Sequence, residues 1–179
     1  MTRGVWKMLA GVATSGSGWL GYHVNQGHIN WGGSHRYDRE YFLGPVHNFG
    51  SAEEFFDALR TQPNGRFPMT RIDGIFSEGS TIGLRVANEK TNFVRVENIT
   101  DCSMLLATTP EHRFKGTAEH SVRAKDGNLL YRIKGKGPKE GGEHVGLQIA
   151  NVAFADTVWP MLLPRTPTAE EVDYNRSIV

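Results

Sequence analysis

Between residues 70 and 135, apolar side chains recur at every second position. In the segment "STIGLRVA" they are Ile82, Leu84 and Val86, and the next segment, "NFVRVENI", repeats the alternation. A period of two is typical of β-strands that bury one face and expose the other. "CSMLLATT" continues the series, and "KGTAEHSVRA" and "NLLYRIKG" flank Asp126-Gly127, a dipeptide typical of tight hairpin turns. The pattern therefore predicts a meandering antiparallel sheet.

Helical patterns lie on both sides of these strands. Ser51 and Glu54 form a capping box, and "PNG" at residues 63–65 ends the helix that it starts. Residues 147–160 carry apolar side chains at helical spacing, and we expect Pro160 to end this second helix. The predicted fold class is α+β: a curved antiparallel sheet of about five to seven strands with one helix before it and one after it, a helix-grip-like roll.

The length of 179 residues fits one domain with one core. We divide the chain into a glycine- and aromatic-rich N-terminal arm (1–34), an α+β core domain (35–163) and a C-terminal tail (164–179). We expect the arm to pack over the sheet, because tryptophans are rarely left in water. Thr168 and Glu171 predict a short helix in the tail.

Composition excludes several classes of protein. A formal net charge of +1 creates no global field, so a nucleic-acid partner is possible but is not indicated by charge. Cys102 is the only cysteine, which excludes an internal disulfide. No apolar run reaches the roughly 18 residues needed for a membrane span, and we expect no cofactor.

Two histidines eight residues apart differ in their expected positions. If residues 117–124 form a strand, His120 lies on its apolar face with Val122, whereas Arg123 points to the other face. Gly116 marks either a bulge or the start of the strand, and in the second case His112 lies in the preceding loop. We predict that His120 is structural or lines a cavity, and that His112 is free to act.

Further candidates for ligand binding follow on the next strand. Tyr131 shares the inward face predicted for His120, and together they line a cavity suited to a hydrophobic ligand. Lys134 belongs to a basic, glycine-interrupted run that could hold an anionic group. His120, Tyr131 and Lys134 are therefore the predicted ligand-binding residues.

The remaining clustered histidines are His23, His28 and His35. We predict no metal site, because no regular element sets their geometry. In "SHRYDRE", His35 is an acid/base candidate beside a carboxylate and a guanidinium, although an ordinary polar strand is the competing interpretation.

The order of "HRY", the capped helix, "VRVENITD", "PEHRFKGTAEHSVRAKDGNLLYRIKGKGP" and "NVAFADTVW" resembles the C-terminal domains of Rhs-repeat and related polymorphic secreted bacterial toxins, over roughly residues 35–160. The resemblance implies an effector delivered by a secretion system or a fused carrier, with an immunity protein or carrier protein as partner. On this hypothesis the protein is a hydrolase of RNA or another phosphodiester. His112 and His35 would be its acid/base residues, and Arg123 or Lys134 would stabilise charge.

The same layout resembles the helix-grip proteins of the START and polyketide-cyclase type, which bind apolar ligands between a curved sheet and a long last helix. The expected end at Pro160 counts against this alternative. A third hypothesis is a structural subunit of a larger assembly that docks through its first fifty residues. The toxin hypothesis predicts a protein secreted or delivered into a target cell, and the others predict a cytoplasmic one.

Overall fold

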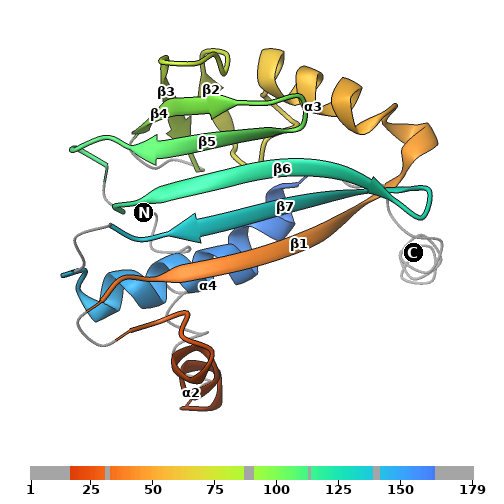
Figure 1. Ribbon diagram of the computed structural model, residues 1–179. Helices are drawn as coiled ribbons and strands as arrows, with labels where there is room; N and C mark the ends of the chain where they lie inside the picture. Colours follow the sequence, from red (N-terminus) through yellow and green to blue (C-terminus); the bar gives the residue numbers. More distant parts are fainter. Residues whose placement is uncertain (1–16, 31–32, 87–90, 113, 139–141, 164–179) are drawn as a thin grey trace, which may run out of the picture.

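A computed structural model describes residues 17–30, 33–86, 91–112, 114–138 and 142–163. One seven-stranded sheet dominates it, with the strand order β1-β7-β6-β5-β4-β3-β2 and every neighbouring pair antiparallel. The strands are β1 (Arg36–Pro45), β2 (Arg71–Asp73), β3 (Thr81–Arg85), β4 (Asn92–Ile99), β5 (Ser103–Thr108), β6 (Thr117–Lys125) and β7 (Asn128–Lys136). The sheet curves, and α4 (Val145–Leu162) passes beneath β1 and β7 (Figure 1).

The predicted fold class is confirmed, including the number of strands and the helices that flank most of them. The structure differs from the predicted order at the start of the chain. A strand, β1, precedes helix α3 (Ala52–Thr61) and pairs with the last strand, β7. The polar-strand interpretation of "SHRYDRE" is therefore correct for the residues from Arg36 onward. The alternation in β1 breaks where the register shifts between Phe42 and Gly44, which hid the strand's full length.

Helix α3 forms as its sequence predicts. The Ser51 side chain accepts a hydrogen bond from the Glu54 amide, and the Glu54 carboxylate accepts one from the Ser51 amide. This reciprocal cap satisfies two backbone donors that the first turn cannot pair. The apolar face then enters the core with four buried residues, Ala52, Phe55, Phe56 and Leu59.

Helix α4 is longer than the sequence predicted. It has 18 residues, and Pro160 lies inside its last turn instead of ending it. A proline there removes one backbone donor only, and the helix continues until the amide of Leu163 closes on the Trp159 carbonyl. A helix of this length spans roughly 27 Å, enough to cross the sheet. The last helix is therefore not cut short at Pro160, and its length does not count against a helix-grip fold.

Helix α2 (Ser17–Asn25) lies in the predicted N-terminal arm and is held against the core through one carboxylate. Asp156 of α4 accepts hydrogen bonds from Trp19 Nε1 at 3.3 Å and from Arg39 Nε at 2.6 Å, and it lies 3.0 Å from His23 Nε2. Ile29, just after the helix, is 1% exposed and belongs to the core. The described part of the arm thus packs on the molecule's own core.

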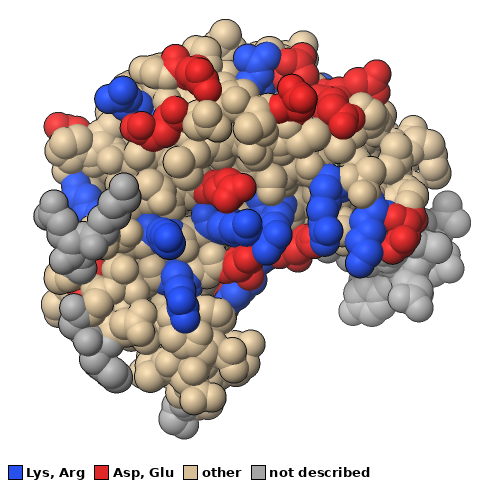
Figure 2. Space-filling model, in the orientation of Figure 1, with Lys and Arg blue, Asp and Glu red and all other residues tan. Residues whose placement is uncertain are grey.

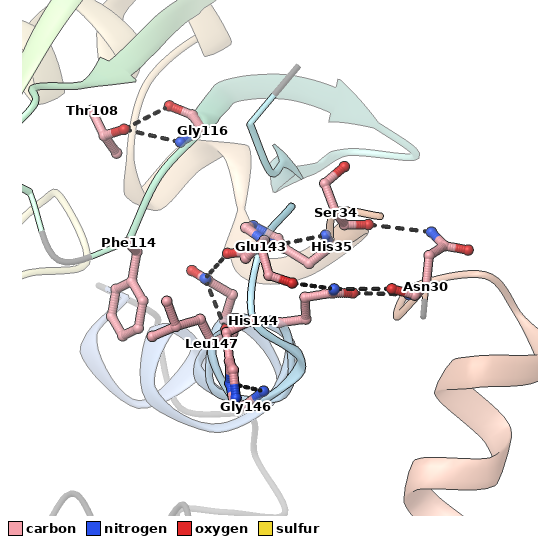
Figure 3. A network of polar contacts seen from close by, with 12 residues as sticks. Asn30, Ser34, His35, Thr108, Phe114, Gly116, Glu143, His144, Gly146 and Leu147 are labelled. Carbon is pink, nitrogen blue, oxygen red and sulfur yellow. Dashed lines mark hydrogen bonds and ion pairs between the residues drawn. The ribbon is translucent and has the colours of Figure 1, made fainter. Parts of the chain in front are cut away.

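Gly116 fixes where β6 begins. Its φ is +131°, a conformation that side chains rarely adopt, and Thr117 is the first residue of the strand. The Thr108 side chain accepts a hydrogen bond from the Gly116 amide at 2.9 Å, and Thr108 donates to the Gly116 carbonyl (Figure 3). Of the two alternatives for this glycine, a bulge and the strand start, the structure shows the strand start.

Residues 1–16 and 164–179 lie outside the described residues, and so does the predicted short helix of the tail. The described helices include none that combines the length and the apolar composition of a membrane span.

Candidate ligand cavity

A cavity of about 130 Å³ lies between the inner face of the sheet and α4. Its apolar wall comes from the loop after α3, from strands β3 to β6 and from α4: Phe67, Leu84, Val94, Leu106, Ala118 and Trp159. The strand residues among them point inward because they occupy the inward phase of their strands, and Phe67 and Trp159 are buried in the core. The volume is close to that of an engineered apolar cavity of about 150 Å³ that binds benzene.

Polar side chains enter the cavity wall at a few places. His35, Tyr37 and His120 are buried, Asn151 and His112 are half-buried, and Lys136 is exposed. The three candidate histidines of the sequence therefore line one cavity. Among the described residues, no hydrogen bond joins His35 to His112, so the two do not form a direct pair.

His35 is paired with a buried carboxylate that the sequence did not identify. Its Nδ1 lies 2.6 Å from Glu143 Oε2, and its backbone amide donates to the same oxygen at 3.1 Å. Asn151 Nδ2 donates to the second oxygen at 3.3 Å. With Glu143 ionised, Nδ1 of His35 is the donor, which leaves Nε2 as the ring nitrogen available to a ligand.

A polar network holds Glu143 in place, as Figure 3 shows. The Gln148 side chain accepts from the Asn30 amide at 2.8 Å and donates to the Asn30 carbonyl at 2.9 Å. It also donates to the Glu143 carbonyl at 3.0 Å, and the Glu143 amide donates to Gly33. The segment before β1 and the start of α4 are thus tied together, which fixes the His35–Glu143 geometry.

His120 is a neutral wall residue. Its Nδ1 lies 3.0 Å from the Tyr131 hydroxyl, and its ring packs against Phe67 and Trp159. Burial lowers the pKa of His120 to about 3, so the ring carries no charge at neutral pH. This position agrees with both roles expected for His120, a structural one and a cavity-lining one. Tyr131, expected to line the cavity with His120, is instead its fully buried hydrogen-bond partner and is not among the residues of the cavity wall.

His112 lies in the loop before β6, as predicted. Its Nδ1 is 3.0 Å from the amide and 2.7 Å from the carbonyl of Phe114, so the ring is held by its own turn. Burial is the main cause that lowers the pKa of His112. The hydrogen bonds to Phe114 therefore restrict the orientation of the His112 ring, which the sequence analysis expected to be free to act.

Arg123 and Lys134 are not part of this cavity. Arg123 Nε donates to Glu40 at 3.0 Å on the outer face of the sheet. Lys134 lies 3.9 Å from Glu119 on the same face, in a band of basic and acidic side chains over β1, β6 and β7 (Figure 2). Strand alternation places both side chains opposite His120, so neither can stabilise charge beside His35 or His112. The structure therefore does not bring Arg123 or Lys134 together with the histidines beside which they were expected to act.

No group of three or more metal-ligating side chains occurs among the described residues. His23 and His28 do meet, with their Nδ1 atoms 2.9 Å apart, but His35 lies elsewhere and pairs with Glu143. Burial is the largest cause that lowers the pKa of His23. In neutral His23, Nε2 donates to Asp156 and Nδ1 accepts from His28, which accounts for this pair without a metal.

Tyr37 and Trp159 form the aromatic part of the wall between His35 and His120. Tyr37 stacks on His35 with a centroid distance of 5.7 Å and meets Trp159 edge-on at 5.3 Å. The ring of Trp159 also packs against His120, with a centroid distance of 5.7 Å. The sequence assigned Trp159 to the apolar face of the last helix, and only the packing reveals that it reaches the cavity.

The comparisons with known proteins concern the fold. No protein-family model and no curated protein matches the chain. Among solved structures, protein MLL2253 from Mesorhizobium loti matches with a TM-score of 0.51 and 11% identity, over 74% of this chain and 99% of that protein. This match supports the arrangement of the sheet and the last helix, and at this identity it carries no information on function.

Two further structures are similar at lower scores. The Aha1 dimer from Colwellia psychrerythraea has a TM-score of 0.46 and 12% identity, over 73% of this chain and 98% of that one. CalU16 from Micromonospora echinospora has a TM-score of 0.46 and 13% identity, over 80% of this chain and 82% of that one. The resemblance to Rhs-type toxin domains is not tested by these comparisons and stays a prediction.

Proposed function

We propose that the protein binds a hydrophobic small molecule in the cavity between the sheet and α4. The observation that carries the proposal is the cavity itself, whose wall is mainly apolar with a few inward polar groups. Such a composition is typical of small-molecule sites. A benzene-sized group fits the enclosed part, and a longer molecule would extend past half-exposed Phe114 and Phe154.

The inner end of the cavity favours an uncharged ligand group. His120 is neutral, and the basic residues of the wall, Lys115 and Lys136, are half-buried and exposed respectively. A charged group placed among Phe67, Leu106 and Trp159 would lose its hydration without gaining a partner. The bound part of the ligand is therefore apolar or polar without charge.

Filling the cavity tests this proposal. Ala118 lines it from β6, and we expect Ala118→Phe to weaken the binding of α-methylstyrene, a benzene ring that carries a three-carbon apolar group, at least tenfold. Binding is measured by shifts of the protein's methyl resonances on titration. Ala124 lies in the same phase of the same strand but is exposed near the hairpin, so Ala124→Phe is the matched control. Absence of binding by the wild type, or equal binding by all three proteins, would overturn the proposal.

A second candidate function is acid–base catalysis in the same cavity, and the His35–Glu143 pair favours it. A carboxylate that holds one nitrogen of an imidazole in a cavity wall is the arrangement of a general base and its orienting group. This candidate retains the toxin-like hydrolase hypothesis with His35 in the central role. Arg123 has no part in it, because it lies on the outer face.

The toxin-like form predicts that expression of the protein slows bacterial growth and that His35→Gln abolishes the effect. Glutamine keeps a hydrogen bond to Glu143 but cannot take up a proton. His47 is exposed on the 3-10 turn η1 (Val46–Asn48), so cells carrying His47→Gln should grow as slowly as those with the wild type. Growth is followed with the soluble protein level matched. Unimpaired growth with the wild type, or slow growth with His35→Gln, excludes this candidate.

A further inference from the structure

Two neighbouring hydrogen-bond donors in the cavity wall lack an acceptor in the described part of the molecule. Tyr37 is 7% exposed, and its hydroxyl makes no hydrogen bond to a described residue. Trp159 is also 7% exposed, and its buried Nε1 has no partner among those residues. Leaving the buried indole N–H of Trp159 unpaired costs about 1–3 kcal/mol. Because the two rings are in edge-on contact, both donors call for an acceptor at the same part of the wall.

The position of Tyr37 directs its hydroxyl towards the cavity. Gly135 is its partner on β7, and a Cβ at Gly135 would overlap the end of the Tyr37 ring, including the hydroxyl. The ring therefore lies across the backbone of β7. On the far side, Gly135 pairs with Ala118 of β6, which lines the cavity. The hydroxyl thus reaches over β7 towards the cavity wall.

No described polar group nearby accepts a hydrogen bond from either donor, and the open Nε2 of His35, whose ring stacks on Tyr37, makes no hydrogen bond with it. Glu143 is engaged by His35 and Asn151, and the Tyr131 hydroxyl by His120. Burial raises the pKa of Tyr37, so its hydroxyl keeps its proton and remains a donor. An acceptor from outside the protein is the partner that this geometry lacks.

We propose that the cavity ligand is a neutral carbonyl compound whose oxygen accepts a hydrogen bond from the Tyr37 hydroxyl, next to the Trp159 indole. The inference rests on the proposed binding function and adds the chemical class of the ligand. A carbonyl oxygen has two lone pairs and can serve both donors, and it needs no countercharge. The apolar body of the ligand then lies against Phe67, Leu84 and Leu106.

The test compares acetophenone with α-methylstyrene, which has the same planar shape but carries =CH2 in place of the carbonyl oxygen. Their dissociation constants are measured by resonance shifts for the wild type and for Tyr37→Phe, which removes the hydroxyl alone. We expect Tyr37→Phe to weaken acetophenone binding about fivefold, the effect of one net hydrogen bond, and to leave α-methylstyrene unchanged. Equal effects on both compounds would overturn the inference.

Tyr41 provides the matched control on the same strand. Its hydroxyl donates to the Ala155 carbonyl at 2.6 Å, and it does not line the cavity, so Tyr41→Phe should leave the ratio of the two constants unchanged. The wild type offers a second measurement. We expect the Trp159 indole N–H resonance to move downfield with acetophenone and not with α-methylstyrene. If α-methylstyrene binds but neither difference occurs, the carbonyl inference fails alone; if neither compound binds, the proposed function fails with it.

Discussion

Replacing Gly116 by alanine is expected to lower the free energy of unfolding by at least about 3 kcal/mol. The φ of +131° is strained for any residue with a Cβ, and that Cβ would overlap the Lys136 carbonyl and lie 2.9 Å from the Cα of Gly137. Relief requires β6 and β7 to separate where their pairing begins, at Thr117 and Lys136. Urea unfolding followed by circular dichroism measures the loss.

Gly127→Ala separates the two causes of this effect. Gly127 has a φ of +75° in the hairpin turn, but no atom lies within 4 Å of its added Cβ. Its substitution should cost about 1 kcal/mol, the conformational part alone. Similar losses in the two variants would show that the contact with β7 does not constrain Gly116.

Acidification from pH 7 to pH 5 is expected to destabilise the protein, with a share of about 2 kcal/mol from His120. The pKa of this buried ring is lowered to about 3, whereas its ordinary value is 6.5. Below pH 6.5 the unfolded chain takes up a proton that the folded chain refuses. The stability that His120 provides is therefore complete above pH 6.5 and falls by about 1.4 kcal/mol per pH unit until pH 3.

The variant His120→Gln isolates this share. Glutamine does not titrate, so the difference in unfolding free energy between wild type and variant should shrink by about 2 kcal/mol as the pH falls from 7 to 5. Other histidines with a lowered pKa, His23, His28 and His112, contribute equally to both proteins. Ring resonances of His120 that titrate with a midpoint above pH 6 would contradict the prediction.

Much of the fold was predictable because local signals agree with the final packing. The reciprocal cap sets the start of α3, and strict alternation places Val94 and Val96 in the core. The same rule placed His120 inward, where it is found. It also placed Arg123 outward, so the proposal that Arg123 acts beside His112 conflicted with the strand geometry from the outset.

The cavity's polar end could not be predicted in the same way. Glu143 follows a glycine- and lysine-rich loop that suggests a solvent-exposed segment, and its partner His35 is 108 positions away. Only the pairing of β1 with β7 brings the two segments together. Similarly, Trp159 with its unpaired indole N–H and its neighbour Tyr37 look like ordinary core aromatics until their packing is known.

The pairing of the first strand with the last has a consequence for how the chain folds. Arg36 of β1 pairs with Lys136 of β7, so β1 has no strand partner until β7 has been synthesised. Every other pair of neighbouring strands in the sheet is also consecutive along the chain and can pair early in folding. Closing so long a loop is slow, and docking of β1 is the expected late step of folding. Tyr37 belongs to β1 and His35 directly precedes it, so both reach the cavity wall only when β1 docks. The polar end of the cavity therefore forms only when the sheet is complete.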